Sequence, residues 1–249
     1  MGGKLLKSEI NTESNLEIKL YSEIIKNNGV VFDVGARDSN LPLINQNANY
    51  FLFEPIKYNF NNLVDRFKNK KNIKLINSAL SDKEEITTIF LESESISKRI
   101  NFNYIWRYVK PERVVNGEQE IINCNTLKKY IDDNNISKIN LLKIDVEGYE
   151  LKVITGLFEH LKIVENIVFE YSVGTYESSN ASLIDLLNQL NDFELYLLYN
   201  NTISKLDGSV NDIYNSIKNI DNLQQSIESW ITNIDSLSIY NLDRLLSPV

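Results

Sequence analysis

Two acidic residues, Asp33 and Glu54, each follow a short apolar run and lie 54 − 33 = 21 residues apart. Gly35 comes just after the first run, and a glycine there lets the backbone turn sharply and approach a ligand closely. A glycine turn at the end of one strand, with an acid about 20 residues further on, is the pattern that binds the ribose hydroxyls of nucleotide cofactors. The two acids therefore predict a site for a nucleoside-containing cofactor at the carboxyl ends of two parallel strands.

Three further acids stand at the ends of later apolar runs. Asp145 and Glu147 follow the run 138–144, and Glu170 ends the run 163–169. The carboxyl ends of parallel strands meet at one edge of a sheet, so we expect these side chains to lie near the cofactor site. A carboxylate in that position can remove a proton from a reacting group. Two of the acids also have a simpler interpretation, since Glu147 could cap the following helix and Glu170 could orient a backbone loop.

The segments around these runs alternate between helix and strand. Apolar residues three and four apart predict helices near 13–28, 60–67, 126–133, 151–161, 183–190 and 209–232, and apolar runs predict strands near 30–34, 50–53, 72–77, 86–91, 120–124, 138–144, 163–171, 193–199 and 237–240. This order predicts an α/β fold with a doubly wound, mostly parallel sheet and helices on both faces. We expect a single domain over 1–249, with the first helix and the last helix as additions at its ends.

The segment 92–119 has no regular periodicity and is expected to form a long inserted loop. It brings aromatic and cationic side chains together, among them Arg99, Trp106 and Arg107. Loops of this length in compact domains are usually functional or disordered. Two interpretations stay open. The segment either packs on the domain as a surface insertion, or forms a lid or wall that binds an acceptor through aromatic faces and arginine forks.

The composition excludes several classes of protein. A formal net charge of −8 and a pI near 4.9 oppose the clustered Lys and Arg that nucleic-acid binding needs, so we expect no nucleic-acid partner. One cysteine and one histidine allow neither a disulfide framework nor a Cys/His zinc site. No apolar run approaches the ~18 residues of a membrane helix, and the first residues are too polar for a signal peptide. We therefore expect a cytoplasmic protein without membrane insertion, and the sequence predicts no oligomeric state.

Four motifs together resemble FkbM-type methyltransferases in their order and spacing. They are Phe-Asp-Val-Gly-Ala at 32–36, Phe-Glu-Pro at 53–55, Asn-Ser-Ala-Leu-Ser-Asp at 77–82 and Leu-Lys-Ile-Asp-Val-Glu-Gly-Tyr-Glu at 142–150. The resemblance covers roughly 30–199. It implies a seven-stranded class I methyltransferase (Rossmann-like) sheet, S-adenosylmethionine as cofactor, and methylation of a hydroxyl group, often on sugars or polyketide-like natural products. The chain departs from the family at Arg37, where Asn is usual, and at Ser39, where Gly is usual, and the loss of this second glycine crowds the first turn.

The resemblance also implies roles for single residues. Glu54 would accept hydrogen bonds from both ribose hydroxyls, and the expected cofactor-binding residues as a group are Asp33, Gly35, Ala36, Arg37, Glu54, Ser78, Ala79 and Asp145. The catalytic candidates are Asp145, Glu147 and Glu170, of which Asp145 is expected to remove the acceptor proton. The candidate acceptor-binding residues are Arg99, Trp106 and Arg107. A metal is not expected, because two acids without a histidine do not identify one.

We expect an O-methyltransferase acting on a sugar hydroxyl of a glycan or glycan precursor, and three alternatives compete with it. An NAD(P)-dependent oxidoreductase would need a full G-x-G-x-x-G turn, which is missing, and the only Tyr-x-x-x-Lys, Tyr214 to Lys218, falls late in a polar helix. A nucleic-acid methyltransferase is opposed by the acidity of the chain and by Asn123 before Cys124, where a Pro-Cys nucleophile would be needed. A non-catalytic cofactor-binding module or enzyme remnant stays open because of the two departures in the first turn.

Overall fold

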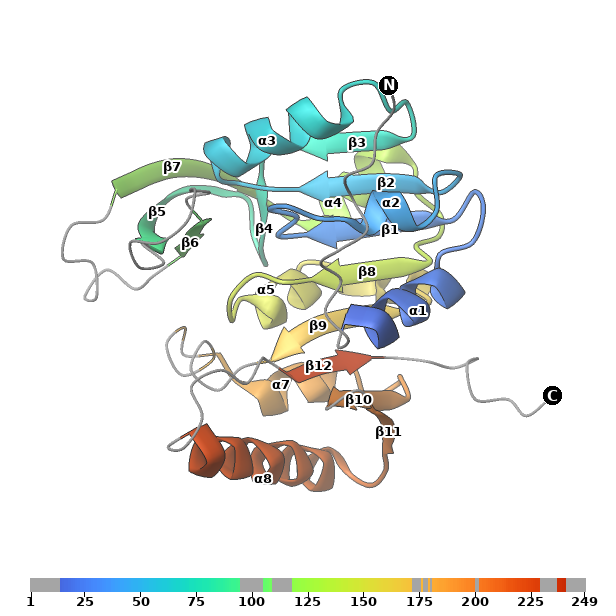
Figure 1. Ribbon diagram of the computed structural model, residues 1–249, viewed down its shortest axis with the longest axis vertical. Helices are drawn as coiled ribbons and strands as arrows, with labels where there is room; N and C mark the ends of the chain where they lie inside the picture. Colours follow the sequence, from blue (N-terminus) through green and yellow to red (C-terminus); the bar gives the residue numbers. More distant parts are fainter. Residues whose placement is uncertain are drawn as a thin grey trace, which may run out of the picture.

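The computed structural model describes residues 14–94, 105–108, 118–171, 176, 179, 181–199, 202–228 and 237–240. Within these ranges the central sheet contains β1 (Val30–Val34), β2 (Asn49–Phe53), β3 (Ile73–Ile76), β8 (Leu141–Ile144), β9 (Ile167–Tyr171), β10 (Leu195–Tyr199), β11 (Thr202–Leu206) and β12 (Leu237–Tyr240). The strands lie side by side in the order β3-β2-β1-β8-β9-β12-β10-β11 (Figure 1). The pairs from β3 to β9 are parallel, β12 is antiparallel to β9 and β10, and β11 is an antiparallel edge. The predicted mostly parallel sheet is confirmed, and β11 makes it one strand larger than expected.

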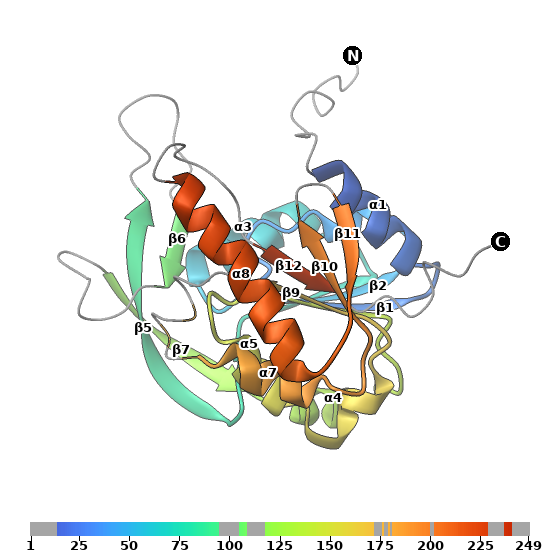
Figure 2. The same cartoon turned by 90° about the horizontal axis from the view of Figure 1, so that it is seen from below.

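Helices cover both faces of this sheet (Figure 2). One face packs against α1 (Ser14–Ile24), α2 (Leu41–Ile44) and α3 (Lys57–Phe67), and the other against α4 (Leu127–Asn134), α5 (Glu150–Thr155), α7 (Leu183–Gln189) and α8 (Val210–Glu228). Within β1, Val31 packs into the first layer and Phe32 into the second, and both are fully buried. Burying a large apolar side chain stabilises the fold by about 1.5–3 kcal/mol, so both layers hold the strand in place. This double burial explains why the strands read as continuous apolar runs.

A second sheet lies beyond the carboxyl ends of β1, β2 and β3 (Figure 1). Within the described residues it consists of β4 (Ala79–Leu80), β5 (Glu85–Glu94), β6 (Ile105–Tyr108) and β7 (Glu118–Asn125), in the order β4-β7-β5-β6. The structure corrects the expected loop over 92–119, because β5 continues to Glu94, β6 pairs with it, and β7 begins at Glu118. It also takes the predicted strand 86–91 out of the central sheet. These strands are held by backbone hydrogen bonds between strands, which polar residues form as readily as apolar ones.

Two predicted helices differ from the observed ones. The first helix, α1, ends at Ile24 rather than near residue 28. The predicted helix 151–161 is divided into α5, which ends at Thr155, and a 3-10 helix, η2 (Phe158–Ile163). Gly156 lies at the break, where a Cβ would be 2.1 Å from the carbonyl O of Ser81. A glycine is therefore needed for the start of the second sheet to pass this close to the end of α5.

Across the described part of the chain, no helix combines the length and the apolar character that a membrane-spanning helix needs.

Candidate functional site

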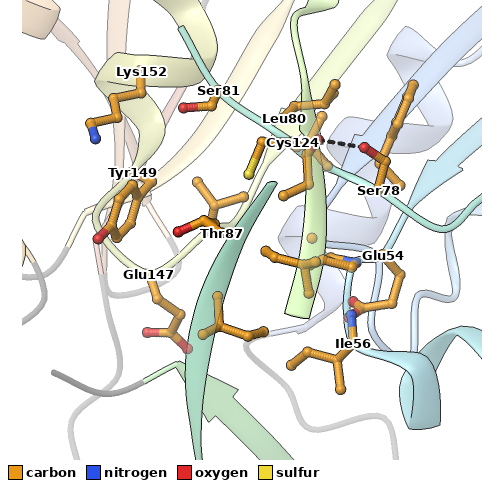
Figure 3. Close-up of a pocket in the computed structure, with 18 of the residues that line it drawn as sticks. Glu54, Ile56, Ser78, Leu80, Ser81, Thr87, Cys124, Glu147, Tyr149 and Lys152 are labelled. Carbon is orange, nitrogen blue, oxygen red and sulfur yellow. Dashed lines mark hydrogen bonds between the residues drawn. The ribbon is translucent and has the colours of Figure 1, made fainter. Parts of the chain in front are cut away.

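A pocket of about 290 Å³ lies between the carboxyl edge of the central sheet and the second sheet. Gly35, Glu54 and Asp145, which follow β1, β2 and β8, line it from the central sheet, and Thr87 of β5 lines it from the second sheet. Figure 3 shows Glu54 on one side of the cavity and Glu147 on the opposite side. The structure thus brings acids from two separate parts of the sequence around one cavity.

Glu54 is held in a fixed position at the end of β2. It is only 3% exposed, and its Oε2 accepts the backbone N–H of Arg37 at 2.9 Å while its Oε1 accepts that of Ile56 at 2.8 Å. Asn59 Nδ2 approaches Oε1 less closely, at 3.5 Å. Burial raises the pKa of Glu54 to about 7, against the opposing effect of these donors. A carboxylate has about four acceptor positions, so capacity remains for hydroxyl donors from a ligand.

The turn after β1 depends on close backbone contacts. The N–H groups of Gly35 and Ala36 both donate to the carbonyl O of Phe53 at 3.0 Å, which joins the turn to the end of β2. Gly35 has a φ of +80°, and a Cβ on it would lie 1.9 Å from the carbonyl O of Asp145. Only a glycine fits between these two strand ends. The Ala36 side chain is buried in the layer of α1 and is not among the residues that line the pocket.

The two family departures in this turn lie in different surroundings. Arg37 lines the pocket, and its backbone is left-handed, with a φ of +36°, a conformation that Asn adopts more readily than Arg. Ser39 is not among the lining residues, and its Oγ accepts the backbone N–H of Leu41 at 3.2 Å at the start of α2. The missing second glycine therefore affects the entry to α2 rather than the pocket wall.

The predicted edge for an adenine ring follows β3. Ser78 and Ala79 both line the pocket, and the Ser78 hydroxyl lies 2.8 Å from the carbonyl O of Ala79 (Figure 3) and 3.0 Å from that of Asn123 in β7. The Asn77 side chain donates to the carbonyl O of Glu54 at 2.9 Å. These bonds attach the segment to both sheets, so its place in the pocket wall is well defined.

The three catalytic candidates lie close together after β8 and at β9. Asp145 and Glu147 line the pocket, whereas Glu170 is not a lining residue and shares a side-chain hydrogen bond with Asp145. Burial, together with the neighbouring charges of Asp145 and Glu147, raises the pKa of Glu170 to about 8. Near neutral pH Glu170 therefore carries a proton, and its carboxyl group can donate a hydrogen bond to Asp145. Within the described residues, no group of three His, Cys, Asp or Glu side chains is arranged to hold a metal ion.

Asp33 lies beside the pocket rather than in its wall. It is fully buried and is paired across β1 and β8 with Lys143, whose Nζ lies 3.5 Å from Asp33 Oδ1 and 3.2 Å from Asp145 Oδ2. Side chains alternate between the faces of a strand, so Asp33 lies on the same face as Val31, toward the layer of α1. The structure therefore connects Asp33 to Asp145 through Lys143 and does not place it among the residues that would contact a cofactor.

The loop between β8 and α5 has an unusual backbone. Glu147 has a φ of +55° and Gly148 a φ of +94°. The buried Glu150 holds this shape, because its Oε1 accepts the N–H groups of Val146 and Gly148 at 3.2 Å each, and Ser179 Oγ donates to the carbonyl O of Gly148 at 3.0 Å. Left-handed non-glycine residues concentrate at functional sites. Sequence reasoning missed the role of Glu150, although an acid at the first position of a helix after a glycine was a usable signal.

Several lining residues were not predicted as part of the site. In β5, the side chains of Thr87 and Ile89, two positions apart on one face of the strand, point toward the pocket. The strand pattern predicts that they share a face, but not that this face lies against the central sheet. Tyr149 and Lys152 close the side of the pocket opposite Glu54 (Figure 3), with Lys152 Nζ 5.1 Å from the centre of the Tyr149 ring.

The candidate acceptor-binding residues are described only in part. Arg99 lies outside the described residues. Trp106 and Arg107 belong to β6, where the backbone pairs with β5, and their side chains are outside the description. Their predicted role therefore stays a prediction.

Two buried acids, Glu54 and Glu150, and the partly buried Glu170 should make the stability of the ligand-free protein depend on pH. Burial raises the pKa values of Glu54 and Glu150 to about 7 and that of Glu170 to about 8, from an ordinary value of 4.5. The folded state then keeps protons that the unfolded chain releases, so the free energy of unfolding should fall as the pH rises from 4.5 through 8. Melting temperatures measured across this range should decrease, and Glu150→Gln should make the decrease smaller. A melting temperature that rises over the same range would contradict this expectation.

The comparison with protein families gives a match over most of the chain. The family model described as the methyltransferase FkbM domain matches residues 25–198, a range that includes the pocket residues on both sheets. A search of curated proteins finds no match.

Solved structures give weaker likenesses. Methyltransferase FkbM from Methylobacillus flagellatus is 14% identical, with 86% of this chain and 43% of that chain covered and a TM-score of 0.46. SMU.1697c from Streptococcus mutans, in complex with SAH, is 10% identical, with coverages of 93% and 98% and a TM-score of 0.47. An rRNA methylase from Streptococcus thermophilus is 8% identical, with coverages of 94% and 97% and a TM-score of 0.47. The chain thus spans less than half of the first of these proteins, and at such values none of them indicates its substrate.

Proposed function

The chain belongs to the FkbM methyltransferase family, and on this premise we propose that it is an O-methyltransferase whose acceptor is a sugar hydroxyl of a glycan or glycan precursor. S-adenosylmethionine is its cofactor. The observation that carries the proposal is one pocket with two acidic walls. The buried carboxylate of Glu54 lines one side, and Asp145, which is hydrogen-bonded to Glu170 behind it, lines another. The first suits a ribose and the second suits removal of a proton.

The pocket fits the cofactor in three respects. Glu54 has spare acceptor capacity for ribose hydroxyls, and Gly35 lines the pocket and allows the ends of β1 and β8 to approach closely there. Ser78 and Ala79 give an edge for the adenine. Asp145 and Glu147 bring negative charge to the pocket, which favours a cation. When bound, S-adenosylmethionine supplies a methyl carbon activated by a positively charged sulfur.

Asp145 is the residue that we propose takes the proton of the acceptor hydroxyl. It lines the pocket, and its carboxylate is fixed by Lys143 Nζ at 3.2 Å and by the hydrogen bond with Glu170. A base held in a fixed position accepts the proton, and it also lowers the entropic cost of aligning the reacting groups. Glu147 contributes charge from a loop whose shape Glu150 maintains.

The second sheet supports a hydroxyl-rich acceptor. Ser81 and Thr87 bring hydroxyl groups to this side of the pocket, which can both donate to and accept from the hydroxyls of a sugar. We propose that Arg99, Trp106 and Arg107 complete the acceptor site. A nucleic-acid acceptor is disfavoured by the net charge of −8 and by the carboxylates in the pocket.

The proposed function is tested by incubating the protein with labelled S-adenosylmethionine and a panel of free sugars, glycans and sugar nucleotides, with products identified by mass. We expect label on a sugar oxygen. Label on a nitrogen or carbon atom, or on RNA added to the same panel, would contradict the proposal. Tighter binding of NADH than of S-adenosylhomocysteine would favour an oxidoreductase instead.

Glu54→Ala should weaken the binding of S-adenosylhomocysteine by about 1.5–3 kcal/mol, the usual worth of hydrogen bonds to a charged group. Isothermal titration calorimetry measures this loss, and circular dichroism checks the fold. Glu165→Ala, which removes a surface partner of Lys138, is the matched control and should bind normally. Unchanged affinity in a folded Glu54→Ala protein would remove Glu54 from the cofactor site.

A further inference from the structure

Four charged side chains form a continuous row across three adjacent strands. Asp33 in β1 is the direct register partner of Lys143 in β8, and Lys143 is the register partner of Val168 in β9. Glu170 stands two positions after Val168 in β9, so it lies on the same face of the sheet as Asp33 and Lys143, and Asp145, just after the end of β8, contacts Lys143 at 3.2 Å. The contacts follow this order, from Asp33 to Lys143, from Lys143 to Asp145, and from Asp145 to Glu170.

The far end of the row is a buried carboxylate that needs a cation. Asp33 is fully buried, and neither of its carboxylate oxygens has a hydrogen-bond partner within the described part of the chain. Lys143 Nζ, 3.5 Å from Oδ1, is the charge that compensates it. A buried carboxylate without such compensation is strongly unfavourable. Asp33 therefore holds Lys143 at this position in the sheet.

Lys143 forms ion pairs with two carboxylates, those of Asp33 and Asp145. Its Nζ lies between Asp33 Oδ1 at 3.5 Å and Asp145 Oδ2 at 3.2 Å, and Glu17 of α1 adds a more distant negative charge. Burial opposes the charge of Lys143, but these carboxylates outweigh it and raise the pKa of the ammonium group. Lys143 is thus a permanent cation beside Asp145.

We propose that the Asp33–Lys143 pair is a positioning unit for the reaction, in which Asp33 holds Lys143 in place and Lys143 holds the Asp145 carboxylate at the pocket, with Glu170 as its hydrogen-bond partner. This inference rests on the proposed function for its role in catalysis. Asp145 is then free to take the proton of the acceptor hydroxyl, and Glu170 acts as a hydrogen-bond donor to it. Of the charged groups facing Glu170, Asp145 and Glu147 disfavour its ionised form, and Lys143 favours it.

The test measures the titration of Glu170 in the ligand-free protein by NMR of ¹³C-labelled carboxyl groups, with Glu170→Gln used to assign the signal. Lys143→Met removes a cation, so the titration midpoint of Glu170 should rise by about one pH unit or more. Asp33→Asn removes an anion, so the midpoint should fall. A row of coupled charges gives these opposite shifts, whereas a purely structural disturbance does not. Lys138→Met, which breaks the surface pair with Glu165, should leave the midpoint unchanged.

A double variant covers the case in which Lys143→Met does not fold because Asp33 is left uncompensated. Asp33→Asn combined with Lys143→Met leaves no unpaired buried charge, and its Glu170 midpoint should lie above that of Asp33→Asn alone. Shifts in the same direction for the two single variants, or equal midpoints for Asp33→Asn and the double variant, would overturn the proposal. Since the measurement needs neither cofactor nor acceptor, a failure of methyl transfer in the panel assay would leave its outcome intact and would count against the proposed function alone.

Discussion

Asp145→Asn should lower kcat by about 10²–10⁴-fold, the range over which general-base catalysis contributes, while the protein still binds S-adenosylhomocysteine. Asparagine keeps the size and the hydrogen bonding of the side chain but cannot accept a proton at this position. The loss should shrink for acceptors with more acidic hydroxyl groups, because these need less help to lose a proton. Steady-state kinetics with an acceptor identified from the panel, together with calorimetry of cofactor binding, would measure both effects.

Glu170→Gln is the matched control for this result. Glu170 is protonated near neutral pH, since its pKa is raised to about 8, and glutamine can donate the same hydrogen bond to Asp145. We therefore expect a much smaller loss of kcat at pH 7 than for Asp145→Asn. If Asp145→Asn works at near the parent rate and Glu170→Gln does not, the base is Glu170. If neither variant is impaired, the enzyme acts by alignment alone.

Gly35→Ala should destabilise the protein by about 2–5 kcal/mol, the sum of about 1–2 for a left-handed alanine and about 1–3 for overpacking. The new Cβ would lie 1.9 Å from the carbonyl O of Asp145, so the ends of β1 and β8 would have to separate. This movement would displace both the turn and Asp145, and cofactor affinity should fall together with stability. Urea unfolding and calorimetry measure the two quantities.

Gly208→Ala is a control for the backbone strain alone. Gly208 also has a positive φ, +111°, but the nearest atom to an added Cβ belongs to a side chain, Asp212 Cβ, at 3.0 Å. Gly208 is not among the residues that line the pocket, so Gly208→Ala should lose some stability and keep its cofactor affinity. If Gly35→Ala behaved like Gly208→Ala in both measurements, the strand ends at the first turn would be less closely packed than the structure indicates.

The strand ends were predictable from the sequence because each is a local pattern. Parallel strands buried on both faces give continuous apolar runs, and the acid after each run falls at the sheet edge where ligands bind. Glu54 and Asp145 could be placed in this way without knowing which strands are neighbours. The family resemblance, which the match over 25–198 confirms, added the order in which the motifs are expected.

The rest of the site depends on contacts that no local pattern shows. The second sheet is formed when Ala79 in β4 pairs with Cys124 in β7, far along the chain, so the apolar runs at 86–91 and 120–124 could predict strands but not a separate sheet. The same limit explains Asp33. Its nearness to Glu54 in the sequence suggested a cofactor contact, but only the register with Lys143 shows that it belongs to the other side of the strand.

The position of β12 has a consequence for how the chain folds during synthesis. The strand Leu237–Tyr240 lies between β9 and β10, both of which are made earlier. Until β12 leaves the ribosome, the parallel part of the sheet and the β10–β11 hairpin each present an open edge to the surroundings. Such edges pair readily with other chains. A nascent chain of this protein is thus exposed to misassociation between the synthesis of β10 and that of β12, and the insertion of a single short strand ends that period.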